Sequence, residues 1–119
     1  MQDLDGMKEN IDKIINKACL LWGVSREDVL GRSRKVPIPF ARTMIAKTIR
    51  EVYGYPFMKI GDILNRDHAT IIHYLKMYDA EYKYNKEFRN FANAMKEVAF
   101  DIRNDLQEEL DDELNEIIG

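Results

Sequence analysis

Cysteine is nearly absent from this 119-residue sequence, and its one copy, Cys19, cannot form an internal disulfide. Cys19 lies among apolar neighbours in a segment with helical periodicity, so we expect a small buried hydrophobe rather than a nucleophile or metal ligand. Long apolar runs are also missing, and none could cross a bilayer. The first ten residues already carry four charges, unlike a signal peptide. These absences predict a cytoplasmic protein with no membrane segment.

Motifs for catalysis and nucleotide binding are absent as well. No G-x-x-x-x-G-K-[ST] sequence occurs, and the basic segment 31–35 lacks that glycine spacing. No nucleophile and base stand out as a pair. His68 and His73 are five residues apart, about 140° around a helix, so they do not share the face that metal ligands need. We therefore expect no enzyme activity, cofactor, nucleotide or metal.

Acidic residues slightly outnumber basic ones, 21 to 18, but the basic residues are concentrated in one part of the chain. The net charge is −3, yet residues 26–89 hold 13 Lys and Arg against 8 Asp and Glu, a net of +5. Residues 90–119 hold 2 basic and 9 acidic residues, a net of −7. Attraction to phosphate depends on the local field, because salt screens charges beyond about 8–10 Å. The middle of the chain can therefore bind a polyanion despite the acidic total.

Apolar residues recur at helical spacing along the whole chain, and no strand pattern is present. The predicted helices cover residues 7–22, a short turn after Ser25, residues 40–53, 58–64 and 67–82, and a final segment from Phe88 to Ile117. Pro37 and Pro39 predict a loop over residues 31–39. The sequence thus predicts a small all-α domain of five or six helices that contains a helix-turn-helix, followed by a long C-terminal amphipathic helix. The expected division is 1–86 for the domain that contains the helix-turn-helix and 87–119 for the acidic extension.

The final segment has several interpretations. Its spacing fits one long helix, or two helices joined near Asn104-Asp105, with an outer face that becomes strongly acidic. It could dock on its own domain with a solvated acidic face, or pair with a second helix because its repeat is close to 3.5 residues. It could also be a tail that competes with DNA. A protein partner or a homodimer through residues 88–117 is therefore a further prediction.

Residues 60–73 carry the pattern of most interest: a short helix, a tight turn at Asn65-Arg66, and a second helix with polar residues at its start. On a helical wheel the second helix has an inward apolar face of Ile71, Leu75, Tyr78 and Tyr82, with Ile72 at its edge. The opposite face presents Ala69, Thr70, His73, Lys76 and Met77. Asp67 is placed to cap this helix. Methyl, hydroxyl, imidazole and ammonium groups on one face suit a DNA major groove. The tyrosines Tyr74, Tyr78, Tyr82 and Tyr84 are expected to pack in the core rather than to stack on bases.

This pattern resembles the C-terminal DNA-binding domain of the bacterial replication initiator DnaA. The matching residues are Ile60-Gly61, Arg66-Asp67-His68, Thr70 and His73. Upstream, the segments 11–14, 24–30 and 32–35 look like the first helix and the basic loop of that family, so the resemblance covers roughly residues 8–82. Two departures stand out. Ala69 replaces the first of two threonines, and the segment 53–58 looks longer than the usual connection.

The resemblance implies a set of DNA contacts. Contacts to bases would come from Asp67, His68, Ala69, Thr70 and Arg34. Contacts to phosphates would come from Arg32, Lys35, Lys47, Arg66, His73 and Lys76. Arg34 would enter a minor groove, where narrow A·T tracts attract arginine; a solvated loop charge is the alternative. His68 could instead be a structural histidine.

The implied function is sequence-specific binding of double-stranded DNA at sites like the initiator's box, in replication initiation or its regulation. Without the nucleotide-binding motor, this chain would occupy or mask such sites or recruit a partner to them. The alternative is a protein-interaction module that acts through the C-terminal helix and retains the helix-turn-helix only as a scaffold.

Overall fold

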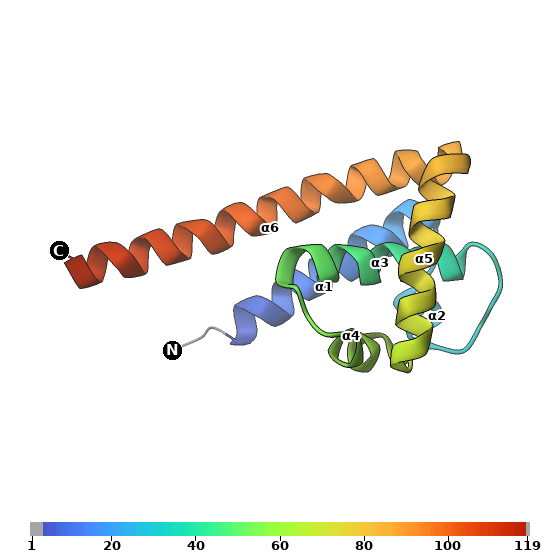
Figure 1. Ribbon diagram of the computed structural model, residues 1–119, viewed down its shortest axis with the longest axis horizontal. Helices are drawn as coiled ribbons and strands as arrows, with labels where there is room; N and C mark the ends of the chain where they lie inside the picture. Colours follow the sequence, from blue (N-terminus) through green and yellow to red (C-terminus); the bar gives the residue numbers. More distant parts are fainter. Residues whose placement is uncertain (1–3, 119) are drawn as a thin grey trace.

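The structure, a computed structural model, describes residues 4–118 of the chain, with side chains from residue 6 onward. This part of the chain forms six helices and no strand, which confirms the all-α prediction. The helices are α1 (Leu4–Trp22), α2 (Arg26–Leu30), α3 (Ile38–Tyr53), α4 (Phe57–Leu64), α5 (His68–Tyr84) and α6 (Lys86–Ile118) (Figure 1). None of them is both long enough and apolar enough to span a bilayer.

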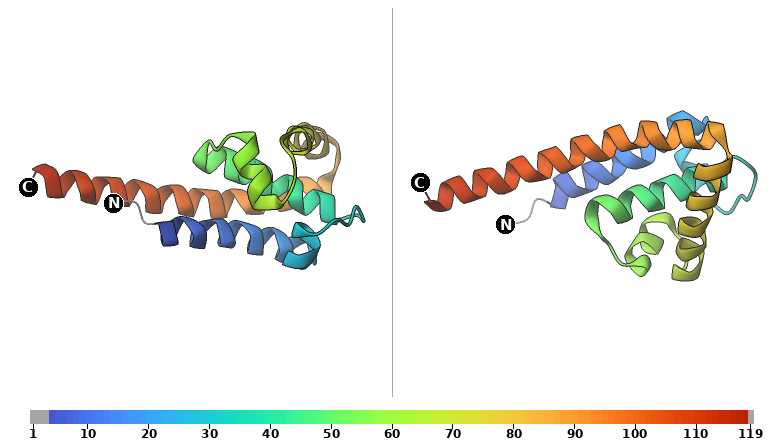
Figure 2. Two further views of the ribbon diagram at one scale, coloured as in Figure 1. Left: turned by 90° about the horizontal axis from the view of Figure 1, so that it is seen from below. Right: turned by 45° about the horizontal axis from the view of Figure 1, so that its top comes forward.

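Helix α3 is the central element of the fold. Nearly all its residues from Ala41 to Ile49 are buried, because α1, α5 and α6 pack around it. Helices α1 and α6 run side by side in opposite directions along the domain (Figure 2). Trp22 closes the core at the end of α1, where its ring centroid lies 5.3 Å from that of Phe40 and 4.7 Å from that of Phe91. Its indole N–H donates to the Met44 sulfur at 3.2 Å, so the one polar atom of the buried ring is satisfied.

Helix α3 begins at Ile38, two residues before the start that the sequence predicted. Pro39 lies in the first turn of the helix, where no backbone N–H is needed and the fixed φ of proline suits the helix. Only residues 31–37 therefore belong to the connection between α2 and α3. Helix α3 ends at Tyr53, and the capping residue Gly54 adopts the left-handed conformation. Three residues, 54–56, then connect it to α4.

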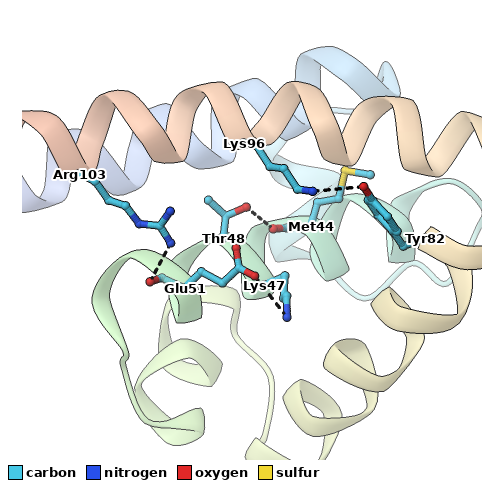
Figure 3. Close-up of polar contacts among 7 residues, drawn as sticks. All are labelled: Met44, Lys47, Thr48, Glu51, Tyr82, Lys96 and Arg103. Atoms are coloured by element: carbon cyan, nitrogen blue, oxygen red, sulfur yellow. Dashed lines mark hydrogen bonds and ion pairs between the residues drawn. The ribbon is translucent and has the colours of Figure 1, made fainter.

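Helix α6 is continuous, so of the two alternatives the structure has the single long helix, with no break near Asn104-Asp105. Its first half buries Phe88, Ala92, Met95, Ala99 and Ile102 in the same core as α1 and α3. Side-chain contacts reinforce this docking: Arg103 donates to the carbonyl of Glu51 at 3.2 Å, and Lys96 donates to the Tyr82 hydroxyl at 3.2 Å (Figure 3). The division into two domains at residues 86/87 stays a prediction. The start of α6 completes the core of the preceding helices.

The second half of α6 leaves the domain. Residues 107–118, which we call the α6 overhang, are all exposed. The overhang projects from the end of the molecule opposite the loop between α2 and α3 (Figure 1). In this arrangement the acidic tail points away from the basic loop. A tail that competes with DNA would instead lie near that loop.

The turn between α4 and α5 depends on close backbone contact. Asn65 ends α4 in the left-handed conformation, with φ 58° and ψ 47°. The N–H of Arg66 then donates to the carbonyl of Gly61 at 2.8 Å. A Cβ atom on Gly61 would lie well inside van der Waals distance of the Arg66 carbonyl oxygen. The helix-turn-helix therefore needs glycine at position 61.

We expect Gly61→Ala to lower the free energy of unfolding by about 1–3 kcal/mol, because the added methyl group forces the turn to open. Asp62→Ala is the matched control, since Asp62 is exposed on the same helix and should cost less than about 0.5 kcal/mol. Urea denaturation of both variants measures the difference. Equal losses in the two would show that the turn tolerates a side chain.

Candidate DNA-binding site

A polar groove lies between the α2–α3 loop and the first turns of α5; we call it the loop–helix groove. It has two adjoining parts, which share Arg34, Arg42, Asp67, Thr70 and Tyr74. The part beside the α4–α5 turn adds Arg32, Gly61, Asp62, Asn65 and Arg66. The part beside α3 adds Pro39, Ala69, His73 and Met77. The groove thus joins the basic loop to the second helix of the helix-turn-helix.

Asp67 begins α5 as the sequence predicted. Its carboxylate accepts the backbone N–H of Thr70 at 2.8 Å, which caps the helix. This hydrogen bond is the main reason why the pKa of the Asp67 carboxyl lies below its ordinary value. His68 and Ala69 follow in the first turn with exposed side chains, and Thr70 is half-buried against the groove. The opening turn of α5 therefore offers imidazole, methyl and hydroxyl groups to a ligand.

The two faces of α5 differ in part from the helical wheel. Ile71 is buried as expected, and Tyr74 is buried beside it. Met77, predicted on the outward face, is half-buried, and its sulfur accepts a hydrogen bond from the Thr43 hydroxyl at 3.4 Å. That prediction is wrong because α3 packs against α5 at this level. Tyr84, predicted to pack in the core, is 79% exposed because it lies in the last turn of α5.

The loop between α2 and α3 presents exposed side chains at Arg32, Arg34 and Lys35. Arg32 and Arg34 line the groove, whereas Lys35 does not. The hydroxyl of Ser33 accepts the backbone N–H of Lys35 at 3.2 Å, which forms a local turn within the loop. Arg34 is therefore the loop arginine that lies beside Thr70 in both parts of the groove.

Arg42 is the groove residue that sequence reasoning missed. It is only 2% exposed, and its guanidinium hydrogen-bonds to four backbone carbonyls. The acceptors are Asp28 at 2.8 Å, Val29 at 2.8 Å, Gly31 at 2.9 Å and Ser33 at 2.5 Å. Burial and the nearby charge of Arg66 lower the pKa of Arg42. The available signal was a charged residue within a stretch otherwise spaced as the apolar face of a helix, from Ile38 to Ile49.

Arg66 and Asn65 fasten the turn to the same loop. The guanidinium of Arg66 donates to the carbonyl of Gly31 and, at 2.8 Å, to that of Asn65. The Asn65 amide donates to the carbonyl of Leu30 at 3.5 Å. Arg66 was expected to contact phosphate, and it is half-buried with part of its donor capacity already used. Its structural contacts link the helix-turn-helix to the basic loop.

The other predicted phosphate contacts lie farther along the helices. Lys76 is exposed on α5, and His73 is exposed and lines the groove. Lys47 is half-buried on α3, where its ammonium pairs with Glu51 at 3.4 Å (Figure 3) and lies 5.3 Å from the centre of the Tyr78 ring. The structure therefore gathers Arg32, Arg34, Arg66, Asp67, Ala69, Thr70 and His73 in one groove, and leaves Lys35, Lys47, His68 and Lys76 outside its lining.

Among the side chains that the structure describes, residues 6–118, no three of His, Cys, Asp or Glu lie where they could hold an ion. Cys19 is buried, and burial is the main cause that raises the pKa of its thiol. Its environment is that of a core residue rather than a reactive thiolate.

A basic loop fastened to a helix-turn-helix, beside the open first turn of the second helix, is the architecture of a DNA-binding domain of the helix-turn-helix class. The sequence assigns the family within this class. The model of the bacterial DnaA protein helix-turn-helix matches residues 11–77, more than half of the chain. The chain therefore belongs to the DnaA helix-turn-helix family.

Curated relatives agree with this assignment. The chain is 34% identical over 62 residues to the chromosomal replication initiator protein DnaA of Pseudothermotoga lettingae, and 36% identical over 64 residues to DnaA 2 of Protochlamydia amoebophila. These matches cover 52% and 54% of this chain but only 14% of each relative. A longer match, 27% identical over 85 residues, joins 71% of this chain to 19% of the DnaA of Leptospira biflexa. The likeness is thus confined to a small part of the relatives.

Proposed function

We propose that this chain binds double-stranded DNA in a sequence-specific manner, with α5 in the major groove and Arg34 in the adjacent minor groove. The observation that carries this proposal is the loop–helix groove, whose two parts are both lined by Arg34 and Thr70. Neighbouring grooves of a duplex require two reading elements that are fixed side by side. Here the α2–α3 loop and the start of α5 supply them.

Each contact follows from the chemistry of its side chain. His68 and Thr70 can donate to or accept from base edges, and the methyl group of Ala69 suits the methyl group of thymine. Asp67 uses its carboxylate to cap α5, so its part in base reading would be indirect. Arg34 suits a narrow A·T minor groove, where the negative potential is strongest.

Phosphate contacts would position the domain without reading sequence. Arg32, Lys35, His73 and Lys76 have exposed side chains for this task. Arg66 and Lys47 would contribute less, because the first donates to backbone carbonyls and the second pairs with Glu51.

The biological context comes from the relatives, whose names describe them as chromosomal replication initiators. We propose that the chain recognises sites like the initiator's own box and acts in replication initiation or its regulation, in association with the nucleoid. The action that we propose for these 119 residues is to occupy or mask such sites or to recruit a partner to them, with no cofactor.

Selection of bound sequences from a random duplex pool tests this proposal most directly. We expect the recovered duplexes to share a short asymmetric site with an A·T-rich flank for Arg34. Recovery of sequences without a common site, together with equal affinity for all duplexes, would contradict sequence-specific binding.

Substitutions in the reading helix provide the second test. His68→Ala and Thr70→Ala should each weaken binding to the selected duplex by about 1–3 kcal/mol and leave binding to random duplex largely intact. Asn16→Ala, on the exposed face of α1, is the control and should change neither affinity. Equal losses on both duplexes would assign His68 and Thr70 to positioning rather than reading.

Salt dependence separates phosphate contacts from solvated charges. Each neutralised phosphate adds roughly −0.9 to the slope of log K against log salt, so Lys76→Ala should flatten the slope by about 1. Lys47→Ala should change it less, because Glu51 already pairs with that ammonium. Lys13→Ala on α1 is the control. A slope that Lys76→Ala leaves unchanged would place Lys76 away from the DNA.

A second candidate function concerns the α6 overhang. Leu110, Leu114 and Ile117 continue the apolar stripe of α6 beyond the domain and are 54%, 53% and 80% exposed. The overhang carries six acidic residues and no basic one. Two overhangs would repel each other, so we propose an amphipathic helix with basic flanks from another protein as the occupant.

A designed peptide can test this candidate. An amphipathic helix with leucines on one face and lysines on the other should bind the chain, more weakly as salt rises, and should fail to bind the Leu110→Gln/Leu114→Gln variant. The same peptide with glutamates in place of lysines is the control and should not bind. Sedimentation should show a monomer. A dimer that the double substitution abolishes would instead assign the overhang to a second copy of the chain.

A further inference from the structure

We propose that Arg42 is a positioning residue that sets the sequence specificity of this domain by holding Arg34 in register with α5. This inference rests on the proposed function, since it concerns how the same groove reads DNA. Arg42 is 2% exposed and cannot itself reach a duplex. Its effect must therefore pass through the residues that its guanidinium holds.

The guanidinium of Arg42 connects three parts of the structure. It is rooted in α3, and it binds the carbonyls of Asp28 and Val29 in α2. It also binds Gly31 and Ser33 in the loop, and Ser33 directly precedes Arg34. The planar fork of arginine can reach several acceptors at once, which a lysine ammonium on its flexible stem cannot match. One side chain thus determines the path of the loop up to the residue before Arg34.

A second arginine ties the loop to the reading helix. The carbonyl of Gly31 accepts hydrogen bonds from both Arg42 and Arg66, and Arg66 lies one residue before the cap of α5. The guanidinium of Arg42 therefore attaches the loop to α3, and the guanidinium of Arg66 attaches it to the start of α5. This double attachment fixes the offset between the minor-groove arginine and the major-groove helix.

The contacts of Arg42 fit the role of a positioning residue better than the role of a core residue alone. Within the described residues no carboxylate forms an ion pair with it. Four of its hydrogen bonds go to loop and helix carbonyls, and its side chain also interacts with that of Tyr74 on α5. Arginine stays protonated in proteins, so the buried charge persists beneath a groove that also holds Arg32, Arg34 and Arg66. A loosened loop would keep its exposed charges for phosphate but lose the fixed placement of Arg34, and fixed placement reduces the ordering cost of binding.

The substitution Arg42→Lys separates geometry from charge, because it keeps the positive charge but loses the fork. Arg42→Met keeps the apolar stem and removes the charge, and it provides a second variant suited to the buried position. Arg26→Lys is the matched control, since Arg26 forms an exposed ion pair with Asp12 away from the groove. Thermal unfolding of each variant sets the temperature at which binding is compared, so that only folded protein is titrated.

Three duplexes report the effect: the one recovered by selection, the same duplex with its A·T flank changed to G·C, and a random duplex. We expect Arg42→Lys and Arg42→Met to weaken preference for the A·T flank by about tenfold, the size of one good base contact. Affinity of Arg42→Lys for random duplex should stay within about twofold of wild type. In an Arg34→Ala background, either substitution should cause no further loss of that preference.

Each contrary result has a distinct meaning. If the folded Arg42 variants keep the full preference for the A·T flank, or if their losses add to that of Arg34→Ala, then Arg42 does not act through Arg34 and the inference is wrong. Equal losses on all three duplexes would make Arg42 a residue of general stability, which also overturns it. If wild-type protein itself does not distinguish the duplexes, the proposed function fails instead.

Discussion

The hydrogen bonds from Arg42 to four backbone carbonyls are the interaction on which the loop–helix groove depends. A loop of seven residues, 31–37, has no secondary structure of its own to fix its path. Its carbonyls need donors wherever water is excluded, and the buried guanidinium provides them. Without that contact, the loop would keep its attachment through Arg66 to the carbonyl of Gly31 but would lose the donor to the carbonyl of Ser33, the residue before Arg34. The site is thus an exposed surface shaped by a buried charge.

The rest of the fold supports this contact by burying α3. Helices α1, α5 and α6 enclose α3, which fixes the root of Arg42 and also places the first turns of α5. The short turn after α4 then brings Arg66 to the carbonyl of Gly31. Core packing and the loop–helix groove are therefore parts of one arrangement, because the helices beneath the groove set its geometry.

The sequence predicted most of the helices because local chemistry sets their limits. Glycine or asparagine in the left-handed conformation ends α3 and α4, and Asp67 caps α5. The Ile-Gly and Arg-Asp-His patterns identify the helix-turn-helix and its family from the sequence alone. The start of α3 was placed two residues late because proline has two roles: Pro39 opposes the interior of a helix but suits its first turn.

What the sequence by itself determined was therefore the helical class, the helix-turn-helix and the family, all of which follow from residues near one another in the chain. Tertiary structure alone decided which faces are covered. It buried Met77 against α3, paired Lys47 with Glu51, and split α6 into a docked half and an exposed half. It also gave Arg42 its acceptors, 9 to 14 residues away in the chain. Such outcomes depend on how helices pack in space. Helical periodicity does not predict which neighbouring helix will pack against a given face.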